Sequence, residues 1–177
     1  MTRRQHSPST GALFVTGVAG CGKSTLGAAL AARLACRFLE GDDYHGPDNV
    51  AKMASGQPLT DVDRWPWLDA LGHAAAQVIR SEGVVVVSCS ALRRAYRERL
   101  RAVLADTATF IQLAGSRQEM ARRLEARTDH FMPPSLLDSQ FAAFEPLAAD
   151  EAGLQLDAGR ACSAMCDSVL DWLSVHG

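Results

Sequence analysis

Residues 17–24 carry the pattern G-x-x-x-x-G-K-S, in which glycines, one lysine and one serine have the spacing of a phosphate-binding loop. Glycine lets backbone N–H groups converge on phosphate oxygens through positive-φ conformations that a side chain would disfavour. Lys23 would place its ammonium group against the β- and γ-phosphates of a nucleotide, and the Ser24 hydroxyl would be a ligand of Mg²⁺. The pattern predicts nucleotide contacts from the loop and the start of the following helix, namely from Gly17, Val18, Ala19, Gly20, Cys21, Gly22, Lys23, Ser24 and Thr25.

The segments on either side of this loop have the composition that such a site requires. Residues 12–16 form a short apolar run typical of a strand, and residues 25–34 are rich in helix-forming residues. A strand, a glycine-rich loop and a helix in this order make the helix N-terminus an anion site. The alternative is a glycine-rich turn that binds nothing, which the combination of motif and context disfavours.

Apolar runs and helix-like periodicities alternate along the rest of the chain. We expect strands at residues 12–16, 37–40, 84–89, 109–113 and 154–157, and the third of these contains four consecutive valines, as in a strand buried on both faces. We expect helices at residues 25–34, 50–54, 68–80, 91–105, 118–126, 135–144 and 165–175. This order predicts one α/β domain with a mainly parallel central sheet, helices on both faces and right-handed crossovers.

Three segments fall outside this alternation. Residues 1–10 read as a polar tail, and residues 44–67, punctuated by Pro47, Gly56, Pro58 and Pro66, read as a loop-rich substrate-binding insertion around one short helix. Residues 127–139 contain two consecutive prolines and read as a mobile lid.

The composition of the chain limits the kinds of binding partner that we expect for it. The chain has 177 residues with 47% hydrophobic and 21% charged side chains, as in an ordinary globular domain. A net charge of −2 gives no reason to expect a nucleic acid, and no apolar run is long enough for a membrane helix. The five scattered cysteines form no C-x-x-C pair, so we expect free thiols and a cytoplasmic location rather than disulfides or a zinc site.

A P-loop alone does not distinguish a kinase from an ATPase or a GTPase. No Asn-Lys-x-Asp string is present, so the guanine-reading element of GTP-binding switches is missing. The central strand ends in Ser88-Cys89-Ser90 instead of an acid, and the acid on the metal side must come from Glu40, Asp42 or Asp43, at the end of the second strand.

Basic residues follow the fourth and the third strands. Arg127 precedes the proline pair, where an arginine can close over a transferring phosphoryl group. Arg123 shares a helix face with it, whereas Arg122 reads as solvated. Arg93 and Arg94 lie in the first turn of a helix, where a cation is disfavoured, so one of them is a further candidate for the site.

Several blocks of the chain resemble the gluconokinases, a family of P-loop kinases. Besides the P-loop, the resemblance is carried by Phe38-Leu39-Glu40-Gly41-Asp42-Asp43-Tyr44-His45, by Asn49, Lys52 and Met53, by Gly56, Pro58-Leu59, Asp61, Asp63-Arg64 and Pro66-Trp67-Leu68, by Ser88-Cys89-Ser90-Ala91-Leu92 with Tyr96-Arg97, and by Arg127, His130-Phe131-Met132-Pro133, Leu136-Leu137 and Ser139-Gln140-Phe141. These blocks span about residues 12–146, and the remainder of the chain carries no such motif.

The resemblance implies a nucleoside-kinase-like fold, a homodimer, and Mg²⁺-assisted transfer of the γ-phosphoryl group of ATP to the 6-hydroxyl of D-gluconate. By position it implies that Asp42 orients or deprotonates the acceptor hydroxyl, that Ser24 and Glu40 serve the metal, and that Arg64 binds the gluconate carboxylate. It further implies that Ser88, Ser90 and Arg97 meet the polyol hydroxyls, that Arg127 and His130 belong to the lid, and that Arg123 stacks on adenine. The chain departs from the family pattern at Asp129, where a glycine is expected, and at Gly159-Arg160, where a proline is expected near adenine.

Alternatives remain open at this stage. The sequence alone does not tell which of Asp42 and Asp43 faces the acceptor. A shikimate-kinase-like enzyme would show a glycine run after the third strand, which is missing here. A nucleotide-binding gluconate sensor would need neither the acid near the P-loop nor the lid arginine.

Overall fold

The computed structural model describes residues 10–126 and 134–176, and within them five parallel strands form one sheet in the order β2-β3-β1-β4-β5. The strands are β1 (Gly11–Thr16), β2 (Arg37–Glu40), β3 (Val84–Ser88), β4 (Ala108–Ala114) and β5 (Gly153–Asp157). β1 is central and pairs with β3 on one side and β4 on the other, so that Val15 lies between Ser88 and Ile111. The fully buried run of β1 and β3 agrees with the expectation from their apolar sequences.

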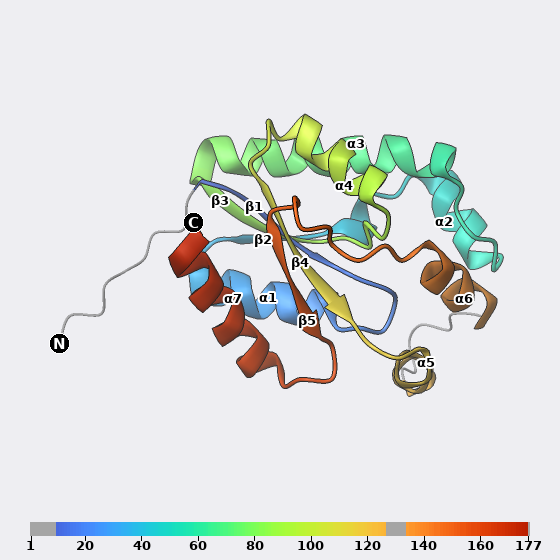
Figure 1. Ribbon diagram of the computed structural model, residues 1–177. Helices are drawn as coiled ribbons and strands as arrows, with labels where there is room; N and C mark the ends of the chain where they lie inside the picture. The colour runs from blue at the N-terminus through green and yellow to red at the C-terminus, as the bar shows by residue number, and fades with distance from the viewer. Residues whose placement is uncertain (1–9, 127–133, 177) are drawn as a thin grey trace.

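Helices cover both faces of this sheet (Figure 1). The helices are α1 (Lys23–Leu34), α2 (Pro47–Ala54), α3 (Asp61–Glu82), α4 (Arg94–Val103), α5 (Arg117–Glu125), α6 (Pro134–Ala143) and α7 (Cys162–His176), with a short 3-10 helix η1 (Gly41–Tyr44) after β2. One core joins α1 and α7 to the sheet and a second core joins α3 and α4 to the opposite face. In Figure 1, α2, α5 and α6 gather at the end of the sheet where the strands finish, which is where open α/β sheets bind ligands.

The helix α3 begins earlier than the sequence predicts, and this is a correction to the irregular segment expected at residues 44–67. Thr60 accepts a hydrogen bond from the Asp63 N–H, and the Asp63 carboxylate accepts one from the Thr60 N–H, which is a complete capping box. Pro66 therefore lies inside α3, within its second turn. The early start places Arg64 in the first turn of a long helix.

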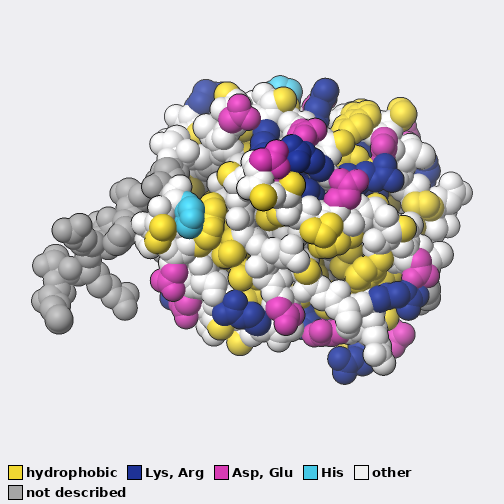
Figure 2. Space-filling view, viewed as in Figure 1, with side chains coloured by type: hydrophobic (Ala, Val, Ile, Leu, Met, Phe, Trp, Pro, Cys, Tyr) yellow, Lys and Arg dark blue, Asp and Glu magenta, His cyan; other side chains and the backbone are white. Residues whose placement is uncertain are grey.

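The surface shows no gathering of basic residues on the face drawn in Figure 2, where acidic and basic side chains alternate. Ion pairs such as Arg94–Asp150 and Arg99–Asp69 account for part of this alternation. Among the described residues, the helices are too short or too polar to cross a membrane.

Candidate active site

The phosphate-binding loop connects the end of β1 to α1 and contains a tight turn. The Cys21 N–H bonds to the Val18 carbonyl over 3.4 Å, and Gly20, the third residue of this turn, has φ of 80°, as in a type II turn. Gly22, with φ of 96°, is the N-cap residue of α1, directly before Lys23. These two glycines occupy backbone conformations that other residues rarely adopt, which explains their fixed places in the motif.

The backbone N–H groups of the loop divide into two sets. Those of Gly17 and Cys21 bond to backbone carbonyls, and that of Ala19 bonds to a side chain. Within residues 10–126 and 134–176, the N–H groups of Gly20, Gly22, Lys23, Ser24 and Thr25 have no protein acceptor. Buried or converging N–H groups need a partner, and at a helix N-terminus that partner is an anion such as phosphate.

The Lys23 side chain folds back along the loop. Its ammonium group donates to the Val18 carbonyl over 3.0 Å. Ser24 and Thr25 are exposed on the first turn of α1. The loop therefore offers one cation, a hydroxyl and a group of amides to the same volume of solvent.

Acidic residues lie at and directly after the end of β2, at the same end of the sheet as the P-loop. Gly41 approaches β3 so closely that a Cβ atom there would collide with the Ser88 carbonyl, and its N–H donates to the Ser88 hydroxyl over 3.2 Å. The Ser88 hydroxyl in turn donates to Glu40 Oε1. This pairing fixes Glu40 at the strand end, while the side chain of Asp42, in η1, is 78% exposed.

Charges on three different elements influence the pKa of Cys89, directly after β3. Burial, and to a smaller extent the charge of Asp42, raise the pKa of the Cys89 thiol, whereas a backbone hydrogen bond at Ala91 and the charges of Lys23 and Arg64 lower it, and the net pKa is about 12. These three charges act on Cys89 from different elements, because Lys23 begins α1, Asp42 lies in η1 and Arg64 lies in the first turn of α3. The segments after β1 and β2 and the start of α3 thus contribute a cation, an exposed carboxylate and a guanidinium.

Arg64 stands over an aromatic ring. Its guanidinium lies 5.5 Å from the centre of the Tyr96 ring, and Arg93 lies 5.9 Å from the same ring. Asp61 binds Arg93 through both carboxylate oxygens at 3.1 Å and accepts from the Tyr96 hydroxyl at 2.5 Å. Arg93 thus already has a carboxylate partner, whereas no carboxylate among the described residues lies within ion-pair distance of Arg64. Arg64 is therefore the guanidinium better placed to receive an anionic ligand.

His45 lies on the buried side of Asp42 and packs against Trp67. Its ring stacks on Trp67 with centroids 4.1 Å apart, and the Trp67 indole donates to the Gly41 carbonyl over 2.7 Å. Burial lowers the pKa of His45, Asp42 raises it and Arg64 lowers it, and the net shift is downward. His45 is consequently neutral at pH 7 and packs as part of the wall, together with Trp67.

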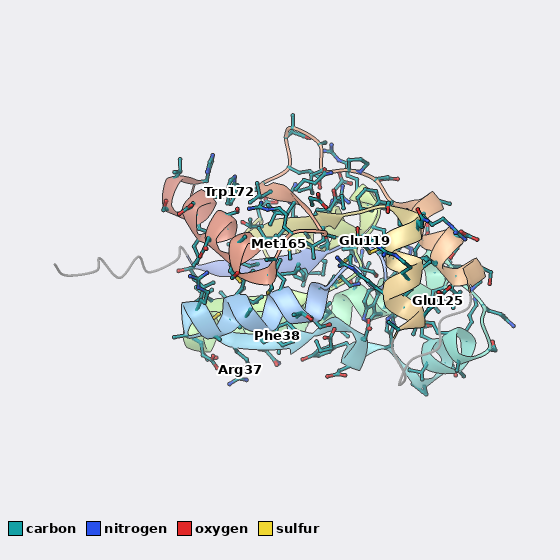
Figure 3. The ribbon with its side chains drawn as sticks, turned by 90° about the horizontal axis from the view of Figure 1, so that it is seen from below. Arg37, Phe38, Glu119, Glu125, Met165 and Trp172 are labelled. Atoms are coloured by element: carbon teal, nitrogen blue, oxygen red, sulfur yellow. The ribbon has the colours of Figure 1, made fainter. Side chains whose placement is uncertain are left out.

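A pocket of about 370 Å³ lies on the other side of the loop. Its lining comes from the loop and from α5, the segment after β5 and α7, and includes Gly20, Gly22, Thr25, Arg123, Ala158, Arg160, Cys162 and Met165. Arg123 donates to the Ala158 carbonyl over 3.0 Å and pairs with Glu119. Figure 3 shows Met165 on α7 beside α1, and Glu119 on α5 at the end of the sheet where the loop lies. The planar guanidinium of Arg123 is suited to stacking on a nucleobase.

Two residues expected to contact substrate are buried instead. Ser88 is fully buried and its hydroxyl is used by Glu40 and Gly41, so it positions Glu40. Arg97 is fully buried as well, and it forms a bidentate pair with Glu151 at 2.7 and 2.8 Å. Arg97 also donates to four backbone carbonyls, those of Ala91, Leu92, Glu145 and Pro146. Its donors are therefore engaged in joining α4 to the segment before β5, which corrects the expectation of a polyol contact.

Of the other residues expected at the site, Ser90 lies in the described part of the chain, whereas Arg127 and His130 do not. Ser90 lies half-buried just after β3, and its carbonyl accepts the Gly17 N–H at 3.3 Å. Arg127 and His130 lie outside the described residues. The same holds for residues 127–133 of the lid that was expected at residues 127–139. Residues 134–139 form the first part of α6.

Some residues of this region were missed by sequence reasoning. The pocket lining by Cys162 and Met165 comes from the part of the chain without recognisable motif, whereas Arg160 lies where the family pattern has a proline near adenine. Gln140 lies in one of the family-like blocks, but nothing in its spacing indicates the hydrogen bond that it accepts from Ala19. A contact across 121 residues leaves no local sequence signal.

This combination of a parallel sheet, a P-loop at its centre and an acid opposite the loop defines the class of P-loop kinases. The AAA domain family model matches residues 13–147 of the chain. A gluconokinase of Gluconobacter oxydans is 46% identical over 139 residues, which cover 78% of each chain. The chain belongs to the gluconokinase family of P-loop kinases.

Two solved structures are similar to the whole chain. A gluconokinase from Sinorhizobium meliloti is 41% identical with a TM-score of 0.84, covering 94% of this chain and 93% of that one. A sugar kinase from Janibacter is 38% identical with a TM-score of 0.88, covering 93% and 95% of the two chains. The similarity therefore extends over the sheet and the helices on both of its faces.

Proposed function

We propose that the chain transfers the γ-phosphoryl group of ATP to the 6-hydroxyl of D-gluconate and releases 6-phospho-D-gluconate and ADP. The observation that carries the proposal is the set of P-loop amides that have no protein acceptor among the described residues, on the loop that also holds the Lys23 ammonium. Asp42 adds an exposed carboxylate, and Arg64 adds a guanidinium over the Tyr96 ring. Gluconate offers an alcohol at one end and a carboxylate at the other, which match Asp42 and Arg64. The names of the similar proteins support this choice of substrate.

Asp42 is proposed as the group that orients the acceptor hydroxyl and takes its proton. An exposed carboxylate near the phosphate-binding lysine can reach an incoming alcohol, which a buried one could not. Lys23 and the unpaired amides of the loop would hold the phosphates and stabilise charge on the transferring group. Arg127 is proposed to add positive charge to the same group from the lid.

Mg²⁺ is proposed to assist the transfer by neutralising charge on the β- and γ-phosphates. Among the described residues, no cluster of three or more His, Cys, Asp or Glu could hold a metal by itself. Mg²⁺ bound to phosphates needs only one or two protein groups beside water. The exposed Ser24 hydroxyl and the Glu40 carboxylate, held by Ser88, have the oxygen chemistry that it requires.

The gluconate carboxylate is proposed to bind Arg64, and the hydroxyls along its chain to bind Ser90 and His130. Residues 44–67 would thus contribute most of the acceptor site, as one part of a single domain. Arg123 is proposed to stack on adenine in the pocket beside α7, where Arg160 lies in place of the expected proline. A homodimer and a cytoplasmic location complete the proposal, and the five free cysteines support a reducing compartment.

The test is release of ADP from ATP and Mg²⁺ with D-gluconate, shikimate, a nucleoside monophosphate or no acceptor, with Lys23→Ala as the blank. We expect turnover with gluconate alone and a loss of at least about a hundredfold in Lys23→Ala, because a phosphate-binding cation is removed. Turnover with shikimate would keep the mechanism and refute the substrate. ATP binding without turnover on any acceptor would favour a gluconate sensor.

A further inference from the structure

One hydrogen bond at the P-loop has no part in the function proposed above. The Ala19 N–H donates to Gln140 Oε1 over 2.7 Å, in a half-buried position, and joins residues 121 apart. Ala19 is the second residue of the turn from Val18 to Cys21, and the hydrogen bond of that turn does not use its N–H. The contact therefore attaches the turn to α6 without disturbing the turn itself.

The part of α6 that carries Gln140 packs against the hydrophobic core. Leu136 and Leu137 are 7% and 2% exposed, and Phe141 packs against the same core as Leu137. Leu137 and Leu136 precede Gln140 by three and four residues and so share its face of the helix, while Phe141 anchors the adjacent face. Arg117 of α5 also pairs with Asp138 of α6. A side chain fixed in this way can hold a loop in one position.

The turn is also held by packing, since Val18 and Cys21 are buried in the core and a Cβ atom at Gly20 would come within 3.1 Å of Met120 and Leu124 in α5. Gly17 is held through its N–H by the Ser90 carbonyl, at the entrance of the loop. Beyond it, the amides of Gly20 and Gly22 are among those that have no protein acceptor within the described residues. The position of the turn decides where these amides point, and Gln140 provides a hydrogen bond from α6 to the middle of the turn.

We propose that Gln140 is a positioning residue for phosphoryl transfer. Its side-chain carbonyl holds the turn at Ala19, and this keeps the amides of Gly20 and Gly22 aimed at the phosphates. It acts through the loop and does not contact the acceptor. The proposal rests on the transfer from ATP proposed above, and wild-type turnover with gluconate establishes that transfer in the same assay.

The first variants are Gln140→Leu, which removes the acceptor, and Gln140→Asn, which keeps the amide on a side chain one methylene shorter. We expect kcat to fall about three- to tenfold in both, the rate equivalent of one hydrogen bond, with KM for gluconate within twofold of wild type. Gln77→Leu, the same change on the exposed face of α3, is the matched control and should not alter kcat. A normal kcat in Gln140→Leu would refute the proposal, as would a rise in KM for gluconate with kcat unchanged.

Ala19→Pro tests the same hydrogen bond from the donor side. Proline has no N–H, and its fixed φ suits the second position of a type II turn. If Gln140 acts through this bond, Gln140→Leu lowers kcat in the wild-type background but not in the Ala19→Pro background. Multiplicative losses in the double variant would show that Gln140 acts by another route and would overturn the proposal. Melting temperatures of all variants separate loss of fold from loss of positioning.

Discussion

Asp42 and Asp43 are neighbours in η1, yet their surroundings distinguish them. The carboxylate whose charge acts on both Cys89 and His45 is that of Asp42. Its side chain approaches the His45 imidazole to 4.0 Å and remains 78% exposed. On its contact with His45, we propose Asp42 rather than Asp43 as the acid that faces the acceptor.

Asp42→Asn is expected to lower kcat by about 10² to 10⁴ while the affinity for ATP stays within a few-fold, since the change removes a proton acceptor and no phosphate ligand. Asp43→Asn is the matched control and should lose far less. Steady-state rates with gluconate, and calorimetric titration with ATP in its absence, measure the two effects. A larger loss in Asp43→Asn would reverse the assignment.

At the level of elements, most boundaries could be predicted because strand and helix signals are local. β2 begins and ends at the expected residues, β1, β3 and β5 differ from expectation by one residue at one end, and β4 is one residue longer at each end. The start of α3 was missed because Pro66 is read as a breaker, whereas the capping box of Thr60 and Asp63 initiates the helix at Asp61, seven residues before the expected start at residue 68. α4 begins at Arg94 instead of residue 91, after Ala91 takes a φ of 32°.

The site was predicted less completely, and for a different reason. The P-loop residues belong to a motif whose spacing alone indicates its chemistry, whereas the role of Asp42 is implied by the resemblance of its block to the gluconokinases. Ser88 and Arg97 lie in such a block too, but their partners lie about 50 residues away. Sequence spacing does not show whether a polar side chain faces a ligand or a distant protein group.

The Arg97–Glu151 pair gives the joint between α4 and the segment before β5 a dependence on pH. Burial raises the pKa of Glu151, hydrogen bonds from Arg97 and the Ala148 N–H lower it, and the net shift is downward from 4.5. Because the pKa is lower in the folded protein, the contribution of Glu151 to stability is complete above about pH 4.5 and is lost as pH falls through the lowered value.

Glu151→Gln is expected to cost about 3–5 kcal/mol of unfolding free energy at pH 7, because it leaves the buried Arg97 cation without a counter-ion. The difference from wild type should shrink as pH falls below about 4. Urea unfolding at several pH values measures it. Asp150→Asn, which breaks the neighbouring exposed pair with Arg94, should change stability by less than about 1 kcal/mol. A difference that stays constant down to pH 3 would contradict the assigned role of Glu151.

Across the whole molecule, the strand order explains why the two halves of the site lie on opposite sides of one loop. From β1 the chain passes to β2 and β3 on one side of the sheet, and later to β4 and β5 on the other. The loop after β1 therefore lies at the position where the order reverses, which is the usual ligand crevice of such sheets. η1 and α3 bring the acceptor groups from one side, and α5 and α7 bring the pocket from the other.

This division predicts that ATP stabilises the entire fold. A nucleotide in the loop and pocket would contact α1, α5 and the segment between β5 and α7, which are far apart in sequence. At about 100 times its dissociation constant, a ligand of the folded state adds ~2.7 kcal/mol, and for a chain of this size each kcal/mol raises Tm by about 2–4 °C. Differential scanning fluorimetry should thus show a rise of roughly 5–10 °C with ATP and Mg²⁺, and little rise in Lys23→Ala at the same ATP concentration. An equal rise in both proteins would mean that ATP binds the fold away from the P-loop.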